Sequence, residues 1–177
     1  MQQMRIAIIG QGRSGHDIHS RFLLGDDSGR YKVVAVVDKI ADRRERAAGE
    51  FGCDTYEDYR ELFSRDDIDL VVNSTFSYMH YPVTLDLLEH GFNVLVEKPF
   101  AMRYDDCRKM IDTADKNGCK LFVFQQSRFA PYYTKIREVV DSGVLGRIVQ
   151  ISIRFGGFSR RWDWQTSQRF GGGSLYN

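Results

Sequence analysis

Residues 5–15 read Arg-Ile-Ala-Ile-Ile-Gly-Gln-Gly-Arg-Ser-Gly, an apolar run that passes directly into three closely spaced glycines. The apolar run predicts a buried β-strand over Arg5–Ile9. Helical character follows over Arg13–Leu24, so the glycines lie between a strand and a helix. A strand, a glycine turn and a helix in this order form the opening unit of a parallel α/β sheet.

The alternation of strands and helices continues to about residue 125. Residues 33–37, Val-Val-Ala-Val-Val, are apolar at every position, which is typical of a strand covered by helices on both faces. The later strands are predicted over Tyr31–Asp38, Asp69–Asn73, Asn93–Val96 and Lys120–Phe124. The later helices are predicted over Asp42–Phe51, Glu57–Phe63, Pro82–His90 and Asp105–Asn117. This order predicts a doubly wound α/β fold.

The pattern changes after about Phe129, and we expect a first domain over residues 1–128 and the start of a second over 129–177. A helix is predicted over Tyr133–Asp141. Over Ile148–Phe155 apolar and polar residues alternate, which is typical of an antiparallel strand with one buried face. Since one strand cannot form a stable sheet, we expect only the incomplete start of an α+β domain.

The three glycines fit the G-x-G-x-x-G spacing of dinucleotide-binding loops. In such a loop the first glycine permits the tight turn, the second lets the backbone approach a diphosphate, and the third allows close helix packing. The N–H groups at the start of the following helix favour an anion. A flexible glycine turn without a ligand is the alternative. The expected cofactor contacts are Gly10, Gln11, Gly12, Arg13, Ser14 and Gly15.

Asp38 closes the second predicted strand. A carboxylate at this place can accept hydrogen bonds from the adenosine ribose hydroxyls and would repel a 2′-phosphate. We therefore expect NAD as the cofactor, with Asp38 and Lys39 at the ribose. NADP is possible, because Lys39, Arg43 and Arg44 could accommodate the phosphate. In the alternative interpretation these cations form a solvated helix face with Glu45.

Further candidates follow two later strands, at the edge of the sheet where ligands bind in a doubly wound fold. They are Ser74, Thr75, His80, Glu97, Lys98 and Pro99. The following proline restricts the backbone of Lys98, whose amine can donate or accept a proton. An ordinary charged turn is the alternative for this tripeptide.

Five motifs, taken in order, resemble the glucose–fructose oxidoreductase/inositol dehydrogenase (Gfo/Idh/MocA) family over nearly the whole chain. They are Gly10–Gly15, Asp38, Glu97-Lys98-Pro99, Arg128-Phe129-Ala130-Pro131 and Gly171-Gly172-Gly173-Ser174-Leu175. The resemblance implies a Rossmann domain followed by a C-terminal α/β domain whose open sheet commonly serves oligomer contacts. It also implies a nicotinamide-dependent oxidoreductase acting on a sugar, polyol or related small molecule, with a homo-oligomer as the full-length form.

The resemblance implies a role for several residues. Lys98 corresponds to the catalytic lysine that touches the reacting hydroxyl or carbonyl and assists proton transfer, and Glu97 and Pro99 would position it beside the nicotinamide. Arg128 resembles an arginine near the nicotinamide and the substrate. From the residues themselves, Trp162 and Trp164 are expected to line a sugar pocket, because aromatic faces suit the apolar side of a sugar ring, with buried anchors of the second domain as the alternative. For His80, which begins the helix after Thr75, helix capping or packing is the alternative to ligand contact.

Two positions depart from the family pattern. Phe76 stands where a proline usually follows the threonine, and Asn177 stands where the family has the first aspartate of Gly-Gly-Gly-x-Leu-x-Asp-x-Gly-x-His-x-x-Asp. The Gly-x-His-x-x-Asp portion supplies a catalytic histidine in many members and does not occur in these 177 residues. We expect this chain to be a fragment that binds the cofactor without efficient turnover. A non-catalytic dinucleotide-binding module or sensor is the alternative function.

Composition excludes several other classes of function. With 25 Lys+Arg against 24 Asp+Glu, the net charge of +1 argues against nucleic acid or an anionic membrane as the main partner. No apolar run approaches the ~20 residues that cross a bilayer. Cys53, Cys107 and Cys119 have no metal-ligand spacing, so we expect no metal, reduced thiols and a cytoplasmic location.

Overall fold

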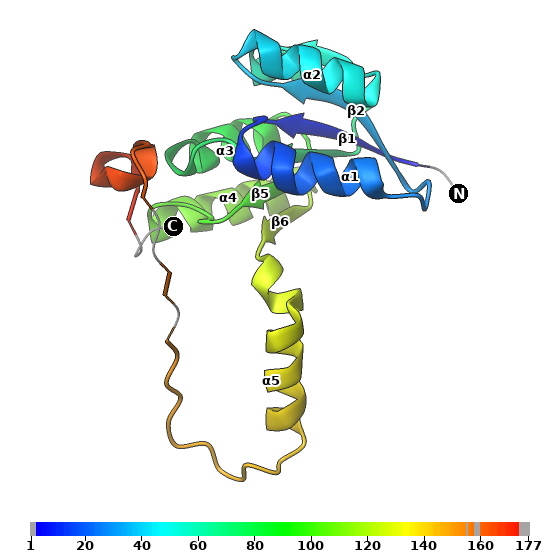
Figure 1. Cartoon of the computed structure of the whole chain (residues 1–177). Coiled ribbons are helices and arrows are strands. Elements are labelled where there is room, and N and C mark those ends of the chain that lie inside the picture. The colour runs from blue at the N-terminus through cyan, green and yellow to red at the C-terminus, as the bar shows by residue number, and fades with distance from the viewer. Residues whose placement is uncertain (1–2, 155, 158–159, 174–177) are drawn as a thin grey trace.

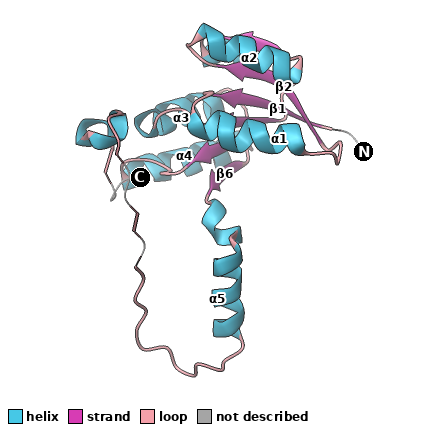
Figure 2. Cartoon of the chain, in the orientation of Figure 1, coloured by secondary structure: helices cyan, strands magenta, loops and turns pink. Residues whose placement is uncertain are grey.

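The computed structural model describes residues 3–154, 156–157 and 160–173. Six parallel strands form one sheet in the order β3-β2-β1-β4-β5-β6. Figure 2 shows the strands in magenta and the helices in cyan. The strands are β1 Met4–Ile9, β2 Tyr31–Val37, β3 Asp54–Tyr56, β4 Leu70–Asn73, β5 Val94–Glu97 and β6 Leu121–Phe124. The strand order reverses between β1 and β4, which makes a switch point. The doubly wound prediction is therefore confirmed.

Helices connect the strands on both sides of the sheet (Figure 1). The α-helices are α1 Arg21–Gly25, α2 Ala41–Phe51, α3 His80–Glu89, α4 Tyr104–Asn117 and α5 Pro131–Asp141. A π-helical segment, Arg13–Ser20, runs directly into α1, so the helix predicted after the glycines is wider in its first turns. The 3-10 segments are Tyr59–Ser64, Ser77–Met79, Gln126–Phe129, Trp164–Thr166 and Gln168–Phe170.

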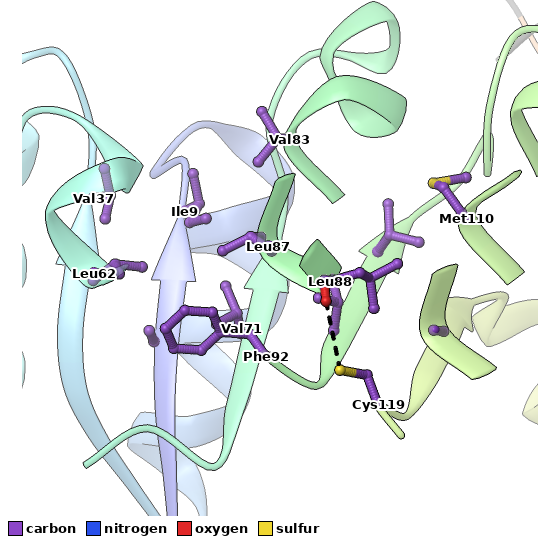
Figure 3. Close-up of a cluster of buried hydrophobic side chains, with 14 of the residues drawn as sticks. Ile9, Val37, Leu62, Val71, Val83, Leu87, Leu88, Phe92, Met110 and Cys119 are labelled. Atoms are coloured by element: carbon purple, nitrogen blue, oxygen red, sulfur yellow. Dashed lines mark hydrogen bonds between the residues drawn. The ribbon is translucent and has the colours of Figure 1, made fainter. Parts of the chain in front are cut away.

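Two clusters of buried apolar side chains lie on the two faces of the sheet. Alternate residues of β1 divide between them, with Ile6 and Ile8 in one cluster and Ala7 and Ile9 in the other. The larger cluster packs the sheet against α3 and α4 (Figure 3). There the Cys119 thiol lies 3.7 Å from the Leu88 carbonyl, and its burial raises the pKa of the thiol. Apolar burial on both faces explains the unbroken apolar strands.

Beyond β6 the chain leaves this layer, and α5 extends away from the sheet (Figure 1). The strand predicted over Ile148–Phe155 is wrong for residues 148–154, which are in no strand; Phe155 lies outside the described residues. Val149, Ile151 and Ile153, the apolar side of the predicted strand, are 83%, 72% and 83% exposed. A strand needs a hydrogen-bonded neighbour and a surface for its apolar side, and the described residues offer this segment neither.

The end of the described chain returns to the loop that follows β4. The Trp164 ring lies edge-on to Phe76, with centroids 5.3 Å apart, and Phe170 lies 5.2 Å from Tyr78. Through these contacts residues 164–170 pack beside the carboxyl edge of the sheet. In the described part of the chain, no helix has the length and apolarity to span a bilayer.

Candidate functional site

The carboxyl ends of the parallel strands bring most of the predicted site residues to one edge of the sheet. The glycine loop, residues 10–15, follows β1, and Asp38 follows β2. Ser74 and Thr75 follow β4, and Glu97 is the last residue of β5. These segments surround the switch point between β1 and β4, where doubly wound folds bind their ligands.

The three glycines of the loop serve different purposes. Gly10 has φ of +89°, and a Cβ on it would come within 2.6 Å of the Ser74 carbonyl oxygen. A Cβ on Gly15 would collide with the Gly10 carbonyl oxygen. A Cβ on Gly12 would meet only the Arg43 guanidinium, at 3.9 Å. The fold therefore requires glycine at positions 10 and 15, whereas at position 12 the missing side chain leaves the backbone open to a ligand.

The loop continues into the π-helical segment, with Gly12 as its N-cap and without a capping side chain. The first N–H groups of a helix have no intrahelical acceptor, so they are suited to a diphosphate. Gln11 is only 2% exposed: its side chain contacts Ser20, its N–H donates to Asp38, and its carbonyl accepts from Arg46, so all of its polar groups are engaged within the protein. Arg13 is exposed and Ser14 is half-buried.

Asp38 is held beside the glycine loop by two backbone donors. Its Oδ2 accepts from the Gln11 N–H at 2.7 Å, and its Oδ1 accepts from the Ile40 N–H at 2.9 Å. Arg43 pairs with the carboxylate at 3.4 Å, and Arg44 donates to the Asp38 carbonyl at 2.7 Å. Both arginines thus contact Asp38 and add positive charge at the expected ribose position. Lys39 is exposed.

The loop after β4 is tied to the glycine loop. The Ser74 hydroxyl lies 2.8 Å from the Ile9 carbonyl oxygen and 2.9 Å from that of Gly10, to which it donates. The Thr75 hydroxyl donates to Asn73 Oδ1 at 2.7 Å. Asn73 is fully buried and its amide donates to Thr84 at 2.9 Å. Asn73 was not among the predicted site residues, although a polar residue at the end of an otherwise apolar strand is a signal for such a position.

His80 is enclosed between two loops. Its side chain is 1% exposed, with Nδ1 2.7 Å from the Pro99 carbonyl oxygen and Nε2 3.2 Å from that of Thr75. Burial lowers the pKa of His80, although the two carbonyls and the Glu97 carboxylate oppose the shift; Lys98 reinforces it. The neutral imidazole can donate to only one carbonyl at a time. This placement fits the packing role better than contact with a ligand.

The turn with Lys98 begins at the end of β5. Glu97 is 5% exposed; its Oε2 accepts from the Lys98 N–H at 3.2 Å, and its Oε1 lies 2.9 Å from His19 Nε2. The Lys98–Pro99 peptide bond is cis. Lys98 itself is half-buried. His19 was not among the predicted site residues, because nothing in its local sequence indicates a partner 78 residues away.

Two predicted residues lie outside this cluster of contacts. Arg128 is exposed on the 3-10 segment after β6, beside a shallow groove that Tyr133 and Arg137 of α5 also line. Trp162 is 95% exposed and has no aromatic neighbour in the described residues. Trp164 makes the aromatic contacts instead, with Phe76 and Tyr78. In the described ranges, no three His, Cys, Asp or Glu residues are grouped to hold a metal ion.

Exchanging single glycines for alanine separates folding from binding. We expect Gly15→Ala to lower the free energy of unfolding by about 1–3 kcal/mol, because its Cβ overlaps the Gly10 carbonyl. Gly12→Ala should leave the melting temperature nearly unchanged, since its φ of −74° and ψ of −160° suit alanine. It should still weaken NADH binding at least tenfold by blocking the approach to the backbone. Thermal melts and fluorescence titrations test both, and normal NADH binding by Gly12→Ala would contradict the assignment.

The buried imidazole makes stability depend on pH. Because the pKa of His80 is lower in the folded chain than in the unfolded chain, its contribution is complete above about pH 6.5 and is lost as the pH falls. His80→Gln should reduce the slope of unfolding free energy against pH by up to ~1.4 kcal/mol per pH unit. Urea unfolding at about pH 7.5 and pH 5.5 measures this. An unchanged slope in His80→Gln would contradict this assignment.

Known proteins resemble this chain over its whole length. The 2,7-anhydro-N-acetylneuraminate hydratase of Mediterraneibacter gnavus is 28% identical, over 100% of this chain and 47% of that protein. The inositol 2-dehydrogenase of Salmonella typhimurium is 29% identical, over 93% of this chain and 49% of that protein. The chain thus spans about half the length of these curated relatives.

Solved structures confirm the fold and the family. A myo-inositol 2-dehydrogenase from Lactobacillus plantarum superposes with a TM-score of 0.76 at 27% identity, covering 84% of this chain and 44% of that chain. An NAD-binding protein from Listeria innocua gives 0.88 at 26% identity, covering 99% and 51%. The model of an oxidoreductase family with an NAD-binding Rossmann fold matches residues 4–125. This chain therefore belongs to the Gfo/Idh/MocA oxidoreductase family.

Proposed function

We propose that the protein is an NAD-dependent oxidoreductase that interconverts a hydroxyl and a carbonyl group of a sugar, polyol or related small molecule. The observation that carries this proposal is the meeting of an open backbone glycine, a fixed carboxylate and a lysine turn at one sheet edge. Gly12 is open, Asp38 is held by two N–H groups, and Lys98 follows a neighbouring strand.

The residues present fit a dinucleotide. In the proposed binding mode the backbone N–H groups of the glycine loop hold the diphosphate, because they are directed from a helix N-terminus that no side chain caps. The Asp38 carboxylate accepts hydrogen bonds from the adenosine ribose. Ser74 and Thr75 line the cofactor on the side of β4, and the turn of Lys98 lies toward its nicotinamide end.

Lys98 is the proposed catalytic residue. When bound, the nicotinamide supplies or takes up the hydride. In the oxidation direction the Lys98 amine takes the proton from the substrate hydroxyl as the carbonyl forms; in the reverse direction the Lys98 ammonium returns it to the oxygen. Charge stays balanced because the proton leaves the oxygen as the hydride leaves the attached carbon.

The substrate class rests on relatives and on a few residues of this chain. One relative is named inositol 2-dehydrogenase, and a structural neighbour at 26% identity, the WlbA dehydrogenase from Chromobacterium violaceum, was crystallised with NADH and UDP-GlcNAcA. Both names mention a molecule with a polyhydroxylated ring. We propose Arg128 and Trp162 as substrate contacts contributed by the part of the chain after residue 128. A homo-oligomer in the cytoplasm is the proposed state.

Cofactor binding is the first test of the proposal. We expect calorimetry to detect NADH binding by this chain, with NADPH binding more weakly because Asp38 repels the 2′-phosphate. Asp38→Asn should reduce the preference for NADH about tenfold, which is about 1.4 kcal/mol. Asp42→Asn, in the first turn of α2, is the control: it makes the same change in charge at a position other than the Asp38 carboxylate. Failure of the unaltered chain to bind either dinucleotide would refute the proposal.

Turnover tests the role of Lys98. In the full-length gene product, assayed with NAD and a panel of inositols, sugars and sugar acids, Lys98→Met should lower kcat by about 10²–10⁴-fold through loss of acid–base assistance. NADH affinity should change far less. Lys109→Met, at an exposed position of α4, is the matched control. Dinucleotide binding without turnover of any substrate would instead favour a non-catalytic binding module.

A further inference from the structure

A histidine and a glutamate meet in the interior between the glycine loop and the lysine turn. His19 lies on the π-helical segment that follows the loop, and Glu97 ends β5. Their side chains are 7% and 6% exposed, and His19 Nε2 lies 2.9 Å from Glu97 Oε1. The His19 ring also packs on Phe124 at the end of β6, with centroids 4.5 Å apart. This contact joins the element beside the expected diphosphate to the element that carries Lys98.

Glu97 uses its second oxygen on the next residue. Oε2 accepts the Lys98 N–H at 3.2 Å, so one carboxylate contacts both His19 and the backbone of the turn. On the other side of Lys98, the Pro99 carbonyl lies 2.7 Å from His80 Nδ1. Lys98 is therefore flanked by two residues that are each held by a buried histidine.

Apolar packing would serve stability better at this place. Removing a carboxylate from water costs several kcal/mol, and replacing both partners of a buried polar contact with apolar side chains of the same shape can be nearly neutral or stabilising. The surrounding strands supply such apolar side chains in abundance. The pair is better explained by placement, because a carboxylate that contacts two elements fixes their relative positions.

We propose that His19 is a positioning residue that, through Glu97, holds the Lys98 turn at the nicotinamide end of the bound dinucleotide. The inference rests on the proposed function and extends it by assigning a role to a residue outside the ligand-binding loops. Loss of the His19 donor frees Glu97 and lets the Lys98 turn shift. The glycine loop and Asp38 keep their own hydrogen bonds, so the adenosine end of the site is unaffected.

Two ligands separate the two ends of the site. NADH carries a nicotinamide and ADP-ribose does not, so only NADH depends on the Lys98 turn. For His19→Leu, which removes the donor, we expect the Kd for NADH to rise about tenfold while that for ADP-ribose stays within about twofold. For His19→Gln, whose amide nitrogen can replace Nε2, NADH binding should stay close to that of the unaltered chain.

The matched control is a second histidine–glutamate pair on the same segment. His16 Nε2 lies 3.1 Å from Glu50 Oε1, and this pair does not reach the lysine turn. His16→Leu should leave both Kd values unchanged. His19→Leu leaves the buried Glu97 carboxylate without its hydrogen-bond donor, which can prevent folding. In that case the double variant His19→Leu/Glu97→Met removes both partners and should show the same selective loss of NADH affinity.

Three outcomes would overturn the inference. Equal weakening of NADH and ADP-ribose by the His19 variants would assign His19 to the structure of the glycine loop. Unchanged NADH binding by His19→Leu, or by the double variant in its place, would remove its role. Loss of NADH affinity in His19→Gln as severe as in His19→Leu would exclude the hydrogen bond as its cause. In each case NADH binding by the unaltered chain would leave the proposed function intact, whereas no binding would refute both.

Discussion

The close approach of Gly15 to the Gly10 carbonyl is the constraint on which the site depends. No Cβ fits between them, so the helix can begin directly over the turn that ends β1. The Ser74 hydroxyl, in the loop after β4, donates to the same carbonyl, which fixes the two sides of the switch point relative to each other. The open backbone of Gly12 is thereby held at a set place on the sheet edge. In a looser turn the backbone N–H groups of the glycine loop would not point toward one ligand. A diphosphate would then have to order the loop on binding, at a cost in affinity.

The sequence predicted the sheet well where strands are apolar on both faces. β1 and β2 fall within one residue of their expected bounds at both ends, since most of their side chains are buried whichever face of the sheet they lie on. β3, Asp54–Tyr56, was missed because a three-residue edge strand has no apolar run to indicate it. The strand predicted over Ile148–Phe155 is wrong for residues 148–154, for the opposite reason. The alternation of apolar and polar residues is clear there, but alternation describes a preference that only neighbouring strands can satisfy.

The sequence predicts the site residues that belong to local motifs, and it does not predict contacts between distant segments. Gly10, Asp38 and Lys98 stand beside strand ends that the sequence marks, so topology alone brings them to one edge. His19 and Glu97 could not be paired in this way, because the contact joins side chains 78 residues apart. Sequence reasoning places a residue at an edge, whereas the direction of its side chain depends on packing that no single segment encodes.

The distribution of buried polar groups shows what this edge of the sheet requires. Most of the buried polar side chains lie in loops after β1, β2 and β4, at the end of a strand, or in the first turns of the helices that follow. The middle of each buried strand is apolar instead. Each buried polar group must find a partner or destabilise the fold, so their concentration at one edge is not favoured by stability alone. Their hydrogen bonds, such as those of Asn73 and Glu97, join the end of a strand to a helical segment. The edge is therefore built to hold strand ends and helices in fixed relative positions, as a site must do when it aligns two distant ends of one ligand.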